Sequence, residues 1–213
     1  EDLTSANGLD HDNAHDALSD VMATIALAKL FKEAQPKLYN YLYQLKDKRK
    51  IAAMLTVDYQ TVLVHTSSKY SVAHGKTALV MPLAMHPVNK NGVVVYDLNQ
   101  DPQPLIDLPV DEIKQRLFTP RKLLPEGQQP IPIKTIHTNR SPAIAPLSTM
   151  SVEAFERLGI DRKQAQHHFQ MLQKNPQVQQ KIVEIFTPDD TDHSPDDVDQ
   201  QLYTGGFCSS HDK

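Results

Sequence analysis

The sequence predicts an α+β protein in which helices flank a β-rich segment. Near the start of the chain, apolar residues recur at helical spacing. Between about residues 56 and 137, short runs rich in β-branched residues are separated by turn residues, which is typical of strands. Helical patterns with caps return near residue 150. This order does not read as one compact domain, so we expect three parts with the bounds 1–35, 36–188 and 189–213.

Two helices are predicted at residues 14–34 and 36–45. The first has apolar residues at positions 18, 21, 22, 25, 27, 28, 30 and 31, which predicts a broad buried face. Pro36 ends this helix because proline cannot continue the hydrogen-bond ladder. We expect the apolar face to pack on the β-rich part or on another copy of the chain. A basic cluster, KDKRK, follows at residues 46–50.

The middle of the chain predicts a small sheet or barrel. Its strands are expected at residues 60–66, 76–87, 92–98 and 131–137, with a short helix at 108–118.

Three further helices are predicted after residue 150. The first follows Ser151 and ends at Gly159, a residue type that commonly terminates helices. The second begins at Asp161, with Gln164 at the spacing of a capping box. The third has Pro176 at its first position, where the missing N–H is not needed.

The composition excludes several classes of protein. A net charge of −4 over 213 residues gives no general attraction to nucleic acid, so such binding would need a local basic patch. The single cysteine, Cys208, excludes an internal disulfide and favours the reducing cytoplasm. No run of 18 apolar residues occurs, so no membrane span is expected. Because the chain begins with Glu1, we expect it to be part of a longer protein.

Ligand-type side chains are concentrated in LDHDNAHDALSD, residues 9–20. One interpretation is a metal pair, since His11 and His15 are four residues apart and share a helix face. Zinc proteases use His-Glu-x-x-His, but Asp12 stands in place of the glutamate and no third ligand follows. The adjacent His167 and His168 have no partner at metal-ligand spacing, and we expect both at the surface.

A second interpretation pairs His15 with Asp20. Five residues turn a regular helix by ~140°, so the two converge only if His15 lies in the loop that enters the helix. A histidine beside a carboxylate-held metal is a hydrolytic arrangement. The alternative is a helix start whose acidic residues complement the helix dipole, which remains our interpretation of Asp10, Asp12 and Asp16.

The segment NAHDALSDVMATIALAKL resembles the third motif of the DnaQ-like 3′–5′ exonucleases, in the branch with histidine. Several later segments resemble the bacterial exodeoxyribonuclease I family in order, and the resemblance covers essentially the whole chain. They are QPKLYNYLYQLKDKRK, LVMPLAMHPVNKNGVVVYDL, KTIHTNRSPAIAP, ERLGIDR, NPQVQQKIVEIF and VDQQLYTGGF. The resemblance implies that residues 1–35 end a ribonuclease-H-like nuclease domain. Residues 36–188 would form a Src-homology-3-like domain with added helices, and 189–213 a linker and the start of a helical domain.

The resemblance also implies an activity. The family degrades single-stranded DNA from the 3′ end and releases 5′-mononucleotides with Mg²⁺. His15 would be the base that activates water, and Asp20 would be a ligand of the metal pair. The family's other carboxylates precede this helix and are expected before residue 1, so these 213 residues alone are expected to be inactive. The alternative is a non-catalytic module that binds single-stranded DNA or docks a protein.

Candidate DNA contacts follow from the same resemblance and from local positive charge. They are Lys48, Asn91, Lys134, His137, Arg140 and Tyr203, and their alternative is ordinary solvated surface. The family also binds the acidic C-terminal tail of single-stranded-DNA-binding protein, for which Tyr41 matches a contact residue. Ser151 and Gln173 stand where arginine is expected, and Pro146 where glutamine is expected. Tyr41 would otherwise belong to an apolar helix face with Leu38, Leu42 and Leu45.

Overall fold

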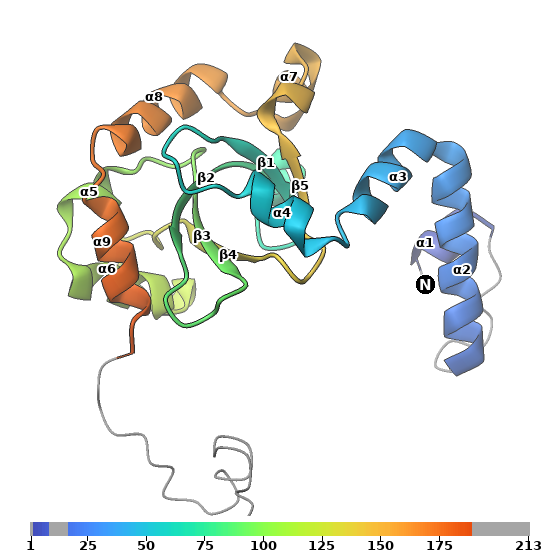
Figure 1. Ribbon diagram of the computed structural model, residues 1–213, viewed down its shortest axis with the longest axis horizontal. Coiled ribbons are helices and arrows are strands. Elements are labelled where there is room, and N and C mark those ends of the chain that lie inside the picture. Colours follow the sequence, from blue (N-terminus) through green and yellow to red (C-terminus); the bar gives the residue numbers. More distant parts are fainter. Residues whose placement is uncertain (1, 9–16, 189–213) are drawn as a thin grey trace, which may run out of the picture.

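The computed structural model describes residues 2–8 and 17–188, with only the backbone of residues 2 and 3. The chain begins with four helices, which are α1 (Asp2–Ala6), α2 (Ala17–Ala34), α3 (Pro36–Gln44) and α4 (Lys48–Met54). Figure 1 shows α1 and α2 away from the sheet, with α3 leading back toward it and α4 in front of β1. No helix in the described part of the chain is long and apolar enough to cross a membrane.

The centre of the protein is a five-stranded antiparallel sheet in the order β4-β3-β2-β1-β5. Its strands are β1 (Leu63–Thr66), β2 (Thr77–Met85), β3 (Gly92–Asp97), β4 (Ile133–His137) and β5 (Ala143–Pro146). The first four confirm the strands expected from the sequence, whereas β5 was not predicted. The register between β2 and β3 shifts between Pro82 and Ala84, where proline lacks the N–H of a regular ladder.

Each face of the sheet packs against its own apolar core, because successive strand residues point to opposite faces. On one face, Leu79, Met81 and Leu83 lie in the first core, which is completed by residues of the later helices. On the other face, Ala78 and Val80 lie in the second core. Burial on both faces explains why β2 and β3 read as nearly unbroken apolar runs rather than as alternating ones.

The later helices cover the first core (Figure 1). They are α5 (Gln103–Asp107), α6 (Val110–Phe118), α7 (Val152–Leu158), α8 (Arg162–Gln173) and α9 (Val178–Phe186). Short 3-10 turns lie at Val72–His74 (η1), Arg121–Leu123 (η2) and Leu147–Thr149 (η3). The α+β class expected from the sequence is therefore confirmed.

The predicted caps of α7 and α8 are present. The Ser151 side chain accepts from Ala154 N, and Gly159 ends α7 with a φ of 59°. The Asp161 side chain accepts from the N–H groups of Lys163 and Gln164. The prediction for Pro176 was wrong, because α9 begins at Val178 and Pro176 lies in the preceding turn.

His168 also differs from its expected surface position. His167 is exposed, but His168 is 4% exposed and its Nδ1 lies 2.8 Å from the carbonyl oxygen of Leu98. His168 shares a helix face with the buried Ala165 and Phe169, and its hydrogen bond joins α8 to the end of β3. It therefore contributes to the packing of α8.

The expected burial of α2 is not found. Leu18 and Met22 are 69% and 59% exposed, and Ala23 is the buried residue of this helix. By contrast, α4 is a helix that was not predicted, and it begins within the basic cluster at residues 46–50. Asp47 caps it by accepting from Arg49 N, and Ile51 is fully buried in the second core.

Candidate nucleic-acid interface

Of the two candidate residues of the nuclease motif, the structure describes Asp20 alone. His15, like His11, lies outside the described residues. Asp20 is exposed in the first turn of α2, and its carbonyl oxygen accepts from Thr24 Oγ1 at 2.8 Å. Among residues 2–8 and 17–188, no group of three or more His, Cys, Asp or Glu could hold a metal ion. The described residues alone therefore do not fit the metal pair that the sequence suggested.

Three of the expected DNA contacts gather where β3 begins and β4 ends. Asn91 precedes β3, and its carbonyl oxygen accepts from Thr138 N just beyond His137. Asn89 Nδ2 lies 3.2 Å from His137 Nδ1. Arg140 is exposed, and its N–H donates to the carbonyl oxygen of His137. Burial, then the charge of Arg140, lowers the pKa of His137.

Gly92 permits this close approach of the chain. A Cβ atom at this position would lie 2.9 Å from both His86 Cβ and Thr135 Cγ2. Any larger residue would push β4 away from the turn at residues 86–91. The turn and the end of β4 therefore depend on glycine to hold Asn91 and His137 together.

Lys134 lies near the other end of β4 and is held there by several contacts. Its Nζ lies 2.5 Å from Ser67 Oγ and 4.4 Å from the centre of the Tyr70 ring. The Tyr70 hydroxyl is in turn 2.8 Å from Nδ1 of the buried His65. Because strand residues alternate, Lys134 and His137 point to opposite faces of the sheet. The structure therefore does not join all the expected DNA contacts into one group.

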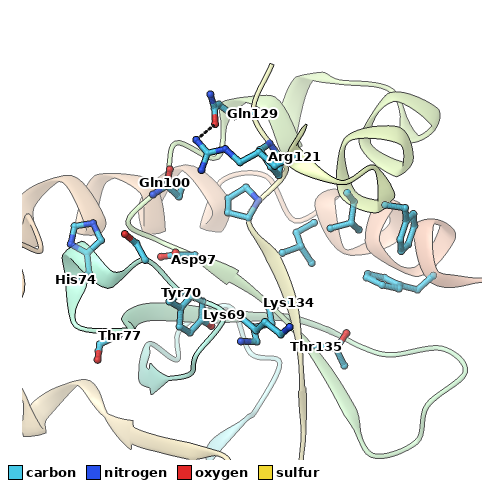
Figure 2. A pocket seen from close by; sticks show the side chains of 17 residues that line it. Lys69, Tyr70, His74, Thr77, Asp97, Gln100, Arg121, Gln129, Lys134 and Thr135 are labelled. Carbon is cyan, nitrogen blue, oxygen red and sulfur yellow. Dashed lines mark hydrogen bonds between the residues drawn. The ribbon is translucent and has the colours of Figure 1, made fainter. Parts of the chain in front are cut away.

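A cleft of about 780 Å³ lies along β4, with Lys134 in its lining. Lys69, Tyr70 and Asp97 also line it, as do Arg121 and Phe118 beyond the strand. Figure 2 shows Lys69 and Lys134 close to Tyr70, with Asp97 and His74 beyond it and Arg121 beside Gln129. The lining carries more cationic than anionic side chains, although the whole chain has a charge of −4.

Lys48 and Tyr41 do not line this cleft. Lys48 is exposed at the first position of α4, and Tyr203 lies outside the described residues. The hydroxyl of Tyr41 donates to the carbonyl oxygen of Ile144 at 2.8 Å, and its ring packs against the second core. Leu45 is buried in the same core, but Leu38 and Leu42 are exposed. The apolar face suggested for these four residues is therefore only partly buried.

The positions that depart from the family's tail-binding pattern have structural roles here. Ser151 caps α7. Gln173 Nε2 donates to the carbonyl oxygen of Tyr59 at 2.7 Å. Pro146 pairs with Leu63 at the end of β5. None of these three side chains is cationic, so none can form an ion pair with a terminal carboxylate.

Two titratable groups at the cleft have opposite effects on stability. The half-buried Asp97 lines the cleft, and the buried His65 contacts the hydroxyl of the lining residue Tyr70. Burial raises the pKa of Asp97 to about 6, from an ordinary 3.8. Burial, with the charge of Lys134, lowers the pKa of the neighbouring His65 to about 4, from 6.5. Asp97 binds its proton more tightly in the folded state, so its contribution is present at low pH and is lost as pH rises through 6. His65 contributes in the opposite sense, and its contribution is lost as pH falls from 6.5 toward 4.

We therefore expect Asp97→Asn to gain stability relative to the unaltered chain as pH rises from 4 to 6, by up to about 3 kcal/mol. His65→Gln should instead gain as pH falls over the same interval. Urea denaturation at several pH values measures both effects. Curves that stay parallel to that of the unaltered chain would show that these groups titrate as they do in the unfolded state.

Little in the sequence indicates this cleft. Lys69, Tyr70, Asp97 and Phe118 were not predicted as site residues, because they come from separate segments that only the fold brings together. The one available signal was the adjacent basic and aromatic pair at Lys69 and Tyr70, in the turn before η1.

Comparison with known proteins gives a consistent result. The family model for the exonuclease I SH3-like domain matches residues 46–188. Exodeoxyribonuclease I of Escherichia coli K12 is 42% identical over 210 residues, which cover 99% of this chain and 44% of that protein. The Haemophilus influenzae enzyme is 39% identical over all of this chain and 45% of its own length. This chain thus spans less than half the length of these relatives.

Solved structures agree with the sequence matches. E. coli exonuclease I in complex with a dA16 oligonucleotide superposes with a TM-score of 0.88 at 42% identity, over 99% of this chain and 45% of that one. Exonuclease I from Methylocaldum szegediense gives a TM-score of 0.84 at 44% identity, over 99% and 43%. A zinc-bound complex of the E. coli protein with single-stranded DNA is also similar to this chain, with a TM-score of 0.88.

Proposed function

This chain belongs to the exonuclease I family, whose SH3-like domain it contains at residues 46–188, and we propose that it is part of an exodeoxyribonuclease I. The whole enzyme degrades single-stranded DNA from the 3′ end and releases 5′-mononucleotides. The observation that carries this proposal is the cationic cleft along β4, in a chain whose relatives were solved with dA16 and dT13 oligonucleotides. Basic residues beside aromatic rings are the usual means of holding single strands.

Within this enzyme, residues 1–35 end the nuclease domain, 36–188 form the SH3-like domain, and 189–213 lead into a helical domain. His15 removes the proton from the attacking water, and Asp20 contributes one carboxylate to a magnesium site. Lys48, Asn91, Lys134, His137, Arg140 and Tyr203 contact the DNA. The single cysteine of the chain agrees with a place in the cytoplasm, where DNA is processed under reducing conditions.

These 213 residues alone are expected to leave DNA intact. The described residues contain no group of three or more metal-ligating side chains, and one carboxylate does not hold a metal pair. A 3′-labelled oligonucleotide incubated with the purified chain and Mg²⁺ should keep its full length. Magnesium-dependent release of labelled mononucleotides by the chain alone would contradict the division of the active site proposed here.

A second candidate is a module that binds without catalysis, which the exposed apolar residues of α2 and α3 favour. Its partner in the family would be the acidic tail of single-stranded-DNA-binding protein, near Tyr41. A cleft of about 450 Å³ does lie beside Tyr41 and includes Lys37. Titration with a peptide ending in an acidic tail separates this candidate from DNA binding, since Tyr41→Phe should weaken the peptide and not the oligonucleotide.

A further inference from the structure

We propose that Lys134 is a site of acylation by acyl phosphates, with Lys69 holding the phosphate of the donor while Lys134 Nζ attacks its acyl carbon. The site goes beyond the proposed nuclease, because acylation requires neither DNA nor magnesium. Both lysines line the cleft along β4, and Figure 2 shows them close to Tyr70. The cleft would thus be modified covalently at one defined amine.

The amine of Lys134 is both accessible and held in place. Lys134 is half-buried, but it lines a cleft of about 780 Å³. Its Nζ lies 2.5 Å from Ser67 Oγ and 4.4 Å from the centre of the Tyr70 ring, so its position is defined. The Tyr70 hydroxyl is itself 2.8 Å from His65 Nδ1. A small donor in the cleft would therefore meet an amine that is already positioned, which lowers the entropic cost of the reaction.

The surroundings of Lys134 favour the neutral amine, which is the form that reacts. Burial, followed by the charge of Lys69, lowers the pKa of Lys134. Among the described residues, no carboxylate forms an ion pair with Lys134 that would stabilise the ammonium. The Tyr70 ring attracts the ammonium and limits this effect. A neutral amine still has two N–H groups, so loss of the proton does not cost Lys134 its hydrogen bond to Ser67 Oγ.

The cleft also offers cations that can hold the phosphate of the donor. Lys69 is exposed, and within the described part of the chain it has no carboxylate partner. Arg121 lines the cleft as well, where it donates to Gln129 Oε1 at 3.2 Å. Asp97 is the single carboxylate among the described lining residues, so cations outnumber anions there. An acyl phosphate carries its charge directly beside its electrophilic carbon, which suits a cation next to an amine.

The reaction needs no reagent besides the acyl phosphate. The lone pair of Lys134 Nζ attacks the acyl carbon, and a C–N bond forms as the bond from that carbon to the bridging oxygen breaks. The bridging oxygen leaves with the phosphate, which takes up the proton that the nitrogen loses. The products are an amide and inorganic phosphate, with no change in oxidation state. Because the amide is uncharged, Lys134 loses its positive charge.

Lys181 provides a contrast within the chain, since it is also half-buried but is expected to be unreactive. Its Nζ donates to the carbonyl oxygens of Ile106 at 2.5 Å and Leu108 at 2.8 Å. The carbonyl oxygen of Leu105 lies 3.4 Å away. Three carbonyl oxygens stabilise the ammonium and occupy its N–H groups. Burial alone therefore does not make a lysine reactive, because the partners of the amine decide which form is favoured.

Incubation of the full 213-residue chain with acetyl phosphate, followed by digestion and mass spectrometry, measures the rate of acetylation at each lysine. Lys134 should be acetylated faster than Lys163, which is exposed on α8 and does not line the cleft. Lys181 should be the slowest of the three. In a chain unfolded by guanidinium chloride, the three rates should become nearly equal. A folded chain in which Lys134 reacts no faster than Lys163 would overturn the proposal.

Two variants of Lys69 test whether this residue holds the phosphate. Lys69→Gln removes the charge, so it should slow acetylation of Lys134 by acetyl phosphate about 2- to 5-fold more than acetylation by an uncharged N-hydroxysuccinimide ester. The uncharged donor reports the change in the amine alone, since it has no phosphate to be held. Lys69→Arg keeps the charge and should restore the rate with acetyl phosphate. Equal slowing with the two donors would overturn the role of Lys69.

Acetylation of Lys134 and the proposed function can fail separately. Lys134 is one of the DNA contacts proposed above, so a chain acetylated mainly at Lys134 should bind oligo-dT with a salt slope smaller by about 0.7. Acetylation at Lys134 that leaves this binding unchanged would support the acylation site and contradict that DNA contact.

Discussion

Replacing His15 by alanine in the full-length exonuclease is expected to lower kcat by about 10²- to 10⁴-fold, because the attacking water loses its general base. Binding of single-stranded DNA should change little, since the expected DNA contacts lie in other segments of the chain. Single-turnover digestion of a labelled oligonucleotide measures the first effect, and anisotropy with the same oligonucleotide measures the second.

His11→Ala is the matched control, since His11 lies four residues earlier in the same motif. In the exonuclease interpretation His11 has no catalytic role, and its replacement should leave kcat nearly unchanged. In the zinc-pair interpretation the two histidines are equivalent ligands, so both replacements should abolish activity and bound zinc together. Equal losses from the two variants would therefore reject His15 as the base.

Ile51→Ala should lower the free energy of unfolding by about 2–5 kcal/mol, because it removes a fully buried side chain from the second core. Ile51 also attaches α4 to the sheet, and α4 carries Lys48 at its first position. A loosened α4 should therefore weaken oligonucleotide binding as well. Urea denaturation followed by circular dichroism gives the stability change.

Ile25→Ala provides the comparison for the same chemical change on α2. Ile25 is 44% exposed, so its replacement should cost less than about 1 kcal/mol. A loss at Ile25 as large as that at Ile51 would mean that the apolar face of α2 is covered in solution, for example by a second copy of the chain. Light scattering would then show from the oligomeric state whether a second copy of the chain covers this face.

The parts of the fold that could be predicted depend on local pattern. The strands between Leu63 and His137 can be predicted because they are runs rich in β-branched residues. Helix ends can be predicted at Ser151, Gly159 and Asp161 because these residue types commonly cap helices. His168 was wrongly expected at the surface, although it continues the spacing of the buried Ala165, Phe169 and Leu172.

Other elements depend on tertiary contacts that no local pattern reveals. β5 has Ile144 as its single strand former, between alanines and a proline, and it is held in the sheet by pairing with β1. α4 begins in a basic cluster and is stabilised by the burial of Ile51. The cleft along β4 unites Lys69, Phe118 and Lys134 from three separate segments, so its composition follows only from the topology of the sheet.

We expect this chain to hold single-stranded DNA through its cationic side chains. Anisotropy of labelled oligo-dT titrated with the chain at a series of salt concentrations measures this binding. The value of log K should fall linearly with log salt, with a slope of about −0.7 for each phosphate contacted. An affinity that does not change with salt, or no binding at low salt, would contradict it.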